Sequence, residues 1–116
     1  MKNWKKIIVE PKMSLEEVIR IIDKTALQIA IVLDENKKLF GTVTDGDIRR
    51  SILRGLNLKT SIDEVMNSNP LFAYKTTPKN ELIDIMKKNS VQHLPIIDDH
   101  NKVVGISSYS ELTEIN

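Results

Sequence analysis

The sequence predicts a mixed α/β fold built from two copies of a β-α-β-β-α unit. Two observations support this prediction. When the chain is shifted by 64 residues, residues 14–52 align with residues 78–116 without a gap, and eight aligned pairs are identical. Within each copy, apolar side chains first recur at helical spacing and then concentrate in two short β-branched runs. An internal repeat of this kind indicates the architecture before any local motif is considered.

The first copy has clear signals for where its helices begin and end. Ser14 and Glu17 form the spacing of a capping box, so a helix is expected to start there. Gly55 is a typical stop for the second helix. The expected elements are an extended segment over 6–11, a helix from Ser14, strands over 29–33 and 39–44 joined by a turn rich in Asp and Asn, and a helix over 47–55.

The second copy predicts the same order of elements. Thr77 is the expected N-cap of its first helix, and Pro78 takes the first helical position, where a missing N–H costs nothing. The expected elements are an extended segment over 70–75, this helix, strands over 94–97 and 103–107, and a closing helix over 111–116.

Each copy of about 45 residues is too small to bury a sufficient core alone, so the two copies are expected to share one. We assign residues 1–56 to the first repeat and residues 70–116 to the second. Residues 57–69 form an ordered connection with a short helical turn, in which Ser61-x-x-Glu64 reads as another capping box. In this connection, inward-pointing side chains are expected at Val65 and Met66.

Composition excludes several classes of protein. Seventeen Lys and Arg residues against sixteen Asp and Glu give a net charge of +1, which is not the basic footprint of a nucleic-acid-binding domain. The chain has no cysteine, so disulfides and thiolate metal sites are excluded. It contains no apolar run long enough for a signal peptide or a membrane span. A cytoplasmic location is expected.

The stretch GTVTDGDIRRS, residues 41–51, carries most of the polar chemistry. A strand that ends at Thr44 and a helix that begins at Asp45–Asp47 leave unpaired N–H groups, which favour a phosphate. Asp47 can accept hydrogen bonds from the vicinal hydroxyls of a ribose, and Gly46 lets a ligand approach the backbone. Arg49 and Arg50 are candidates to balance phosphate charge. The alternative is that Thr44-x-x-Asp47 only caps a helix, with both arginines solvated.

Catalytic and metal-binding interpretations have less support. The histidines are His93 and His100, and neither has a nucleophile at a recognisable spacing. Asp98, Asp99 and His100 are consecutive in a short turn, an arrangement that rarely converges on one ion. Asp45-x-Asp47 resembles the paired aspartates of glycosyltransferases, but so short a pattern recurs by chance. We therefore expect no metal and no catalytic residue; His93 is either a hydrogen-bonded structural histidine or a ligand contact.

Together, the repeat and the motif resemble a tandem pair of CBS domains, named after cystathionine beta-synthase. The resemblance extends from about Ile7 to Ile115. It is carried by VQHLPIID (91–98), the weaker LQIAIVLD (27–34), VMN (65–67) and, above all, GTVTDGD, which matches the family's G-h-x-[TS]-x-x-D nucleotide motif.

Membership of this family implies two pseudo-symmetrically packed repeats with two clefts for adenosine-type ligands such as AMP, ADP, ATP or S-adenosylmethionine. The implied residues of the first cleft are Thr44, Asp45, Asp47, Arg49, Leu71, Phe72, Ala73, His93 and Leu94. Those of the second are Ile8, Val9, Ile29, Ala30, Ser108 and Glu111. Because Glu111 replaces the motif's Asp and Tyr109 crowds the entrance, the second cleft is expected to bind more weakly.

The resemblance implies a regulatory module that needs no cofactor and binds an adenine nucleotide as its ligand. It also implies a homodimer formed through the helices. The segment from 41 to 67 looks most like CBS pairs that precede bacterial sugar-nucleotidyltransferase domains, so the expected partner is such an enzyme, attached or separate. No contact with nucleic acid or membrane is expected. The alternative function is a structural dimerisation domain whose nucleotide cleft is vestigial.

Overall fold

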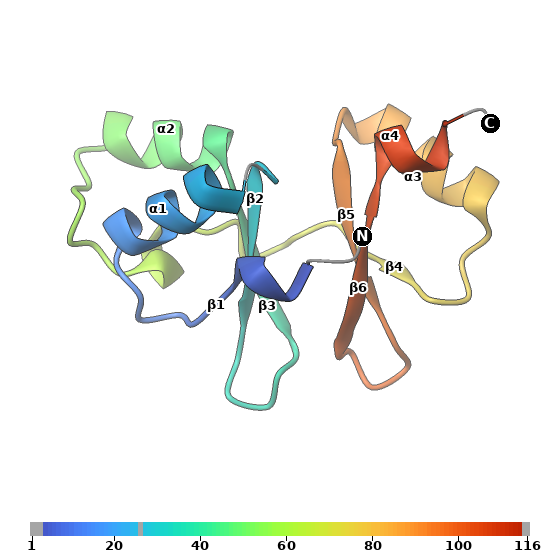
Figure 1. The fold of residues 1–116 in the computed structure, drawn as a ribbon. Coiled ribbons are helices and arrows are strands. Elements are labelled where there is room, and N and C mark those ends of the chain that lie inside the picture. The colour runs from blue at the N-terminus through green and yellow to red at the C-terminus, as the bar shows by residue number, and fades with distance from the viewer. Residues whose placement is uncertain (1–3, 26, 115–116) are drawn as a thin grey trace. The chain divides into compact units, whose positions relative to one another are not determined.

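A three-stranded sheet covered by helices on one face occurs twice in the chain. The computed structural model describes residues 4–25 and 27–114. The chain divides between Pro70 and Leu71 into two units, and each unit is described by itself. Both predicted copies of the mixed α/β unit are present (Figure 1).

In the first unit, a parallel pair and an antiparallel pair of strands share the central strand β2. The sheet order is β1-β2-β3, with β1 parallel and β3 antiparallel to β2. Figure 1 shows the two α-helices of this unit on the same side of the sheet. The elements are the 3-10 helix η1 (Trp4–Ile7), β1 (Ile8–Val9), α1 (Leu15–Thr25), β2 (Ile29–Leu33), β3 (Leu39–Thr44), α2 (Asp45–Leu53) and the 3-10 helix η2 (Ile62–Glu64).

The second unit repeats this plan at the predicted offset. Its sheet has the order β4-β5-β6, again with one parallel and one antiparallel pair. The elements are β4 (Ala73–Tyr74), α3 (Lys79–Asn89), β5 (His93–Ile97), β6 (Val103–Ser108) and α4 (Tyr109–Leu112). A shift of 64 residues carries α1, β2 and β3 onto α3, β5 and β6 with identical bounds, so the alignment of the two copies was correct.

The core of the first unit lies between its sheet and its helices. Leu15, Val18 and Ile22 of α1 pack against Ala30, Val32 and Val43 of the sheet, which explains the predicted helical stripe. The connection also contributes, because Ile62 and Val65 belong to the same buried cluster and Met66 packs against it. The backbone N–H groups of Leu15 and Glu16 donate to the carbonyls of Thr60 and Leu58, so the connection caps the start of α1. The connection is therefore packed into the first repeat.

Several predicted end signals are confirmed. The N–H of Glu17 donates to the Ser14 hydroxyl at 3.2 Å, and that hydroxyl donates to the Glu17 carboxylate at 3.1 Å. Gly55 follows the C-cap of α2 with φ of 90°, a left-handed conformation that favours glycine.

Other local predictions are wrong. The N-cap of α3 is Pro78, and the Thr77 hydroxyl instead accepts the N–H of Tyr74, so it closes the preceding turn. Ser61 makes no cap; its hydroxyl donates to Asp63 at 2.6 Å because the following helix is only a 3-10 turn. The last helix spans Tyr109–Leu112 and not 111–116, of which 115–116 lie outside the described residues.

The extended segments are shorter than predicted. Trp4–Ile7 form a 3-10 helix, and only Ile8–Val9 and Ala73–Tyr74 pair as strands. β1 and β4 are edge strands, and each pairs in parallel with the central strand of its sheet. Of the helices within the described residues, none is long and apolar enough to cross a membrane.

Candidate functional site

Thr44 and Asp47 meet where β3 passes into α2. The Asp47 carboxylate accepts the N–H of Thr44 at 2.9 Å and the Thr44 hydroxyl at 3.0 Å, both through Oδ2. The Asp47 N–H points back to the Thr44 hydroxyl at 3.4 Å. This is a complete capping box, so the helix-cap interpretation of these residues is correct as far as local structure goes. Only 12% of the Asp47 side chain is exposed.

Arg50 occupies the other oxygen of the same carboxylate. Its Nη2 donates to Asp47 Oδ1 at 2.9 Å. The guanidinium lies above Gly46, where an added Cβ would stand 3.1 Å from Nη1 and 3.2 Å from Nη2. The sequence named Arg50 as a phosphate candidate but did not reveal this contact. The available signal was the i,i+3 spacing of Asp47 and Arg50, which places them on one side of a helix.

Asp45 and Arg49 also lie in the first turns of α2, and both are exposed. Within residues 4–25 and 27–114, neither side chain forms a hydrogen bond or ion pair, so both are available to a ligand at this end of the helix. Their assignment to the site stays a prediction.

The predicted base contacts of the first cleft belong to the second unit. Leu71 and Phe72 are exposed, and the ring of Phe72 meets that of Tyr74 edge to face with centroids 5.6 Å apart. Ala73 and Leu94 are instead buried in the core of the second unit. These two residues can therefore offer a ligand the N–H and C=O groups of their strand backbone. His93 begins β5 and is partly exposed.

Partial burial changes the acidity of His93. Desolvation lowers the pKa of the imidazole, and the nearby Glu111 carboxylate opposes this shift more weakly. His93 is therefore neutral at pH 7 and can accept as well as donate a hydrogen bond.

This shift predicts a pH dependence of stability. Because the pKa of His93 is lower in the folded state, the unfolded state binds more protons, and stability is lost as the pH falls below the unfolded value of about 6.5. We expect the melting temperature to fall between pH 7.5 and 5.5, and to fall less in His93→Gln than in the unmodified protein. Differential scanning calorimetry of both proteins measures the difference, and equal pH slopes would contradict the assignment.

The counterpart of the capping box in the second unit is degraded. Ser108 is the N-cap of α4, but its side chain does not cap the helix; its hydroxyl pairs with that of Ser110 at 2.9 Å. The other predicted residues of the second cleft lie in the first unit, where Val9, Ile29 and Ala30 are buried and Ile8 is partly exposed. The loss of the cap agrees with the predicted weakness of this cleft, which stays a prediction.

Asp98, one of the aspartates considered as a metal ligand, stabilises a hairpin turn, and its repeat partner Asp34 does the same. Asp98 Oδ1 accepts the N–H groups of His100 and Lys102 at 2.8 and 3.0 Å, which lowers the pKa of its carboxyl. Asp34 Oδ1 accepts the equivalent N–H groups of Asn36 and Lys38 at 2.8 and 3.0 Å. Asp34 and Asp98 are aligned and identical in the two repeats because each side chain accepts the same N–H groups of its hairpin turn. No group of three potential metal ligands occurs among the described residues.

A separate pocket of about 530 Å³ opens at the C-terminal end of α1. Two of the residues that line it are lysines, whose charge favours an anion, but the carbonyl end of a helix repels one. We therefore assign it no ligand. It is lined by Lys6, Ile21, Lys24, Thr25 and Leu27, none of which is a predicted site residue.

The family model of the CBS domain matches the chain twice, at residues 3–54 and 62–115. The chain belongs to the CBS domain family. It carries two such domains in tandem, as the sequence predicted, and its fold class is that of solved CBS pairs.

Solved CBS structures share the fold across nearly the whole chain. The CBS domain protein PAE2072 from Pyrobaculum aerophilum, complexed with AMP, superposes with a TM-score of 0.83 at 20% identity, covering 95% of this chain and 85% of that one. The CBS domain pair of protein MJ0100, in complex with 5-methylthioadenosine and S-adenosyl-L-methionine, gives a TM-score of 0.80 at 27% identity, covering 92% of this chain and 84% of that one.

Relatives by sequence are longer proteins. An uncharacterized protein of Helicobacter pylori is 28% identical over 93% of this chain, and arabinose 5-phosphate isomerase KdsD of Pseudomonas aeruginosa is 31% identical over 85% of it. The matched part is 33% of the first and 31% of the second, so this CBS pair spans about a third of the length of these relatives.

Proposed function

We propose that this CBS pair is a regulatory module that senses an adenosine-type ligand: AMP, ADP, ATP or a related adenosyl compound. Ligand binding changes how the module packs and thereby the activity of an enzyme attached to it or associated with it. The module itself is proposed to be non-catalytic. Regulation of this kind requires different affinities for two states of the protein.

One observation carries the proposal. At the β3–α2 junction, a carboxylate and a hydroxyl are held together by the Thr44–Asp47 capping box, beside an arginine. The carboxylate suits the hydroxyls of a ribose, and the helix start suits a phosphate. Two solved CBS structures of the same fold are described as complexes with AMP and with S-adenosyl-L-methionine. The base contacts predicted at Leu71, Phe72 and His93 are part of the proposal.

A titration that compares the two motifs tests the ligand site. We expect Asp47→Asn to weaken AMP binding roughly tenfold or more, because a hydrogen bond to a charged acceptor is lost. The amide oxygen still accepts the N–H of Thr44, so the helix cap survives. Glu111→Gln is the matched control and is expected to change the affinity much less. Isothermal titration calorimetry measures both, and equal losses would contradict the asymmetry.

A screen by thermal shift identifies the nucleotide. A ligand present at 100 times its dissociation constant stabilises the native state by about 2.7 kcal/mol, which is a measurable rise in melting temperature. AMP, ADP, ATP, S-adenosylmethionine, cyclic dinucleotides, CMP and GTP form the panel. An unchanged melting temperature with every compound would favour the alternative function below.

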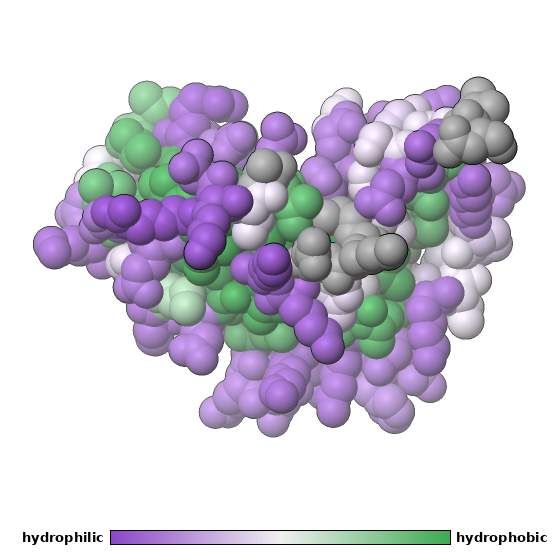
Figure 2. Space-filling view, viewed as in Figure 1, coloured by the Kyte–Doolittle hydropathy of each residue, from purple (hydrophilic) through white to green (hydrophobic). Residues whose placement is uncertain are grey.

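The alternative is a structural dimerisation domain with a vestigial cleft. It is favoured by the capping box, which is already satisfied without a ligand, and by an exposed apolar patch at the end of α2. Ile52 and Leu53 are 53% and 80% exposed, Leu58 in the connection is 49% exposed, and Figure 2 shows apolar surface over the end of α2. We propose that this patch supports a homodimer in either case, which sedimentation velocity tests.

We further propose that the regulated enzyme is a sugar nucleotidyltransferase. The likeness of residues 41–67 to CBS pairs that precede such enzymes supports this choice, whereas the greater length of the relatives supports only an attachment of the pair to a further domain. The test is the activity of such an enzyme with this chain present, in the presence and absence of AMP. A rate that AMP leaves unchanged would contradict this choice of partner.

A further inference from the structure

The acceptor positions of the Asp47 carboxylate are mostly filled. Each carboxylate oxygen offers about two lone-pair positions. Oδ2 already accepts the N–H and the hydroxyl of Thr44, at 2.9 and 3.0 Å. Oδ1 accepts Arg50 Nη2 at 2.9 Å. A vicinal diol needs two acceptor positions, so it cannot bind this carboxylate unless a donor leaves.

Two of the three donors can leave without unfolding anything. The Thr44 hydroxyl can rotate, whereas the Thr44 N–H is fixed by the backbone. The Arg50 side chain is 65% exposed and is held at the start of α2 by its contact with Asp47. A guanidinium at a helix N-terminus is disfavoured by the helix dipole, so this placement depends on the carboxylate. Gly46 makes it possible, since the guanidinium lies where a side chain would be.

A phosphate at the start of α2 would attract both of these donors. It would accept the Thr44 hydroxyl and the Arg50 guanidinium, and each transfer would free an acceptor position on Asp47. The two hydroxyls of the ribose could then take these positions. A nucleoside supplies the hydroxyls but no phosphate, so either the Thr44 hydroxyl or the Arg50 guanidinium must leave Asp47 without a new acceptor, and Arg50 thereby adds to the cost of binding a nucleoside.

We propose that Arg50 is a specificity-determining residue that closes Asp47 to ligands lacking a phosphate. The inference rests on the proposed function, because it concerns the same site. Arg50 and Asp47 together make recognition of the ribose depend on the phosphate, so the module responds to nucleotides and ignores the free nucleoside.

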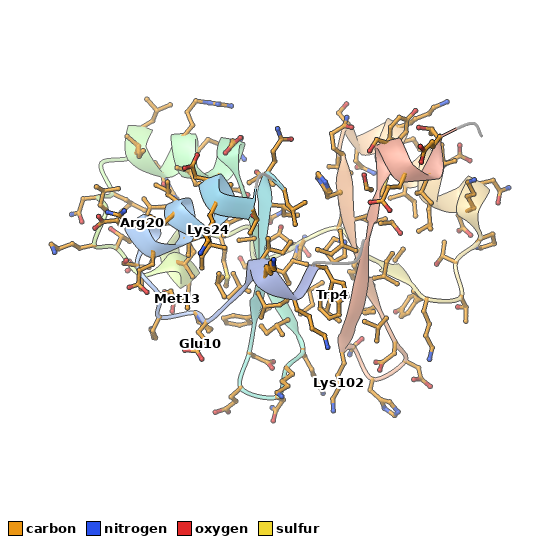
Figure 3. All side chains as sticks on the ribbon, viewed as in Figure 1. Trp4, Glu10, Met13, Arg20, Lys24 and Lys102 are labelled. Carbon is orange, nitrogen blue, oxygen red and sulfur yellow. The ribbon has the colours of Figure 1, made fainter. Side chains whose placement is uncertain are left out.

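The test measures the affinities of AMP and adenosine by calorimetry for three proteins. Arg50→Gln is expected to weaken AMP binding and to strengthen adenosine binding, so that the ratio of the two affinities falls by roughly tenfold or more. Arg20→Gln is the control, since Arg20, which Figure 3 labels on α1, also forms an ion pair within its own helix, with Glu16 at 2.8 Å. It removes the same charge and is expected to leave the ratio unchanged.

A second variant disturbs the contact of Arg50 with Asp47 but keeps the positive charge of Arg50. Gly46→Ala keeps the arginine but places a Cβ 3.1 and 3.2 Å from its terminal nitrogens, so the flexible guanidinium must shift by a few tenths of an ångström. Backbone strain is not introduced, because Gly46 is not in the left-handed region. We expect the ratio of the AMP affinity to the adenosine affinity to fall in this variant, but less than in Arg50→Gln, because the guanidinium is displaced and not removed.

The outcomes separate the two proposals. If the unmodified protein binds AMP, and Arg50→Gln weakens AMP and adenosine equally or leaves their ratio unchanged, this inference is overturned and the proposed function stands. If the unmodified protein binds no compound of the panel, both are overturned. If it binds S-adenosylmethionine, which has no phosphate, at least as tightly as AMP, only this inference is overturned. Circular dichroism confirms that each variant is folded, which is expected because a single exposed ion pair contributes little to stability.

Discussion

Ile62→Ala is expected to destabilise the first unit by about 2–5 kcal/mol, although Ile62 lies in the connection between the repeats. Its side chain is completely buried and belongs to the core cluster around α1. The backbone around it is fixed as well, because the N–H of Ile62 donates to the carbonyl of Met13 at 2.7 Å. The surroundings cannot collapse onto the missing atoms, so a cavity remains and adds to the lost transfer energy.

Urea unfolding followed by tryptophan fluorescence measures this effect. Trp4 is the only tryptophan and lies in the first unit, so its signal reports unfolding of the unit that contains Ile62. Leu58→Ala is the matched control from the same connection. Leu58 is 49% exposed and contributes to α1 through its backbone carbonyl, which alanine keeps, so we expect a change within about 0.5 kcal/mol. Similar shifts for the two variants would show that the connection is not part of the core.

Gly41→Ala is the second large effect that we expect, with a loss of about 1–3 kcal/mol from overpacking. The connection crosses β3 at this point: the N–H of Thr42 donates to the carbonyl of Asn67 at 3.1 Å, and the N–H of Asn67 returns a bond at 2.8 Å. A Cβ at residue 41 would clash with Sδ of Met66 and would stand 2.9 Å from the carbonyl oxygen of Asn67. Met66 can move aside, but the carbonyl cannot move without breaking the bridge.

Gly105→Ala is the control that the repeat provides. Gly105 is the aligned partner of Gly41, yet a Cβ there has no atom of its own repeat within 4 Å. We expect this variant to be neutral or slightly stabilised, because alanine reduces the freedom of the unfolded chain by about 0.4–1 kcal/mol. Met66→Ala in the Gly41→Ala background is expected to restore only part of the loss. Full restoration would show that the side chain, and not the Asn67 carbonyl, causes the clash.

The sequence alone determined the order of the α-helices and strands and the bounds of the four longer strands. The repeat supplied two independent samples of one pattern, so the strands over 29–33 and 39–44 and both β5 and β6 were found to within one residue. Thr44 and Asp47 were also found from sequence, because a cap acts between residues three apart. These features depend on interactions between residues a few positions apart in the chain, and such spacings can be read directly from the sequence.

Tertiary structure decided the features that depend on distant segments or on side-chain competition. Thr77 has the right spacing for a cap, but its hydroxyl satisfies the N–H of Tyr74 in the preceding turn. Gly41 and Gly105 are equivalent in the alignment, and only the crossing of residues 66–67 makes the first one indispensable. Arg50 could have faced solvent, and its position over Gly46 follows from the acceptor left open on Asp47. In each case, several partners could satisfy a polar group or fill a space. The tertiary packing decides which of them lies close enough to do so.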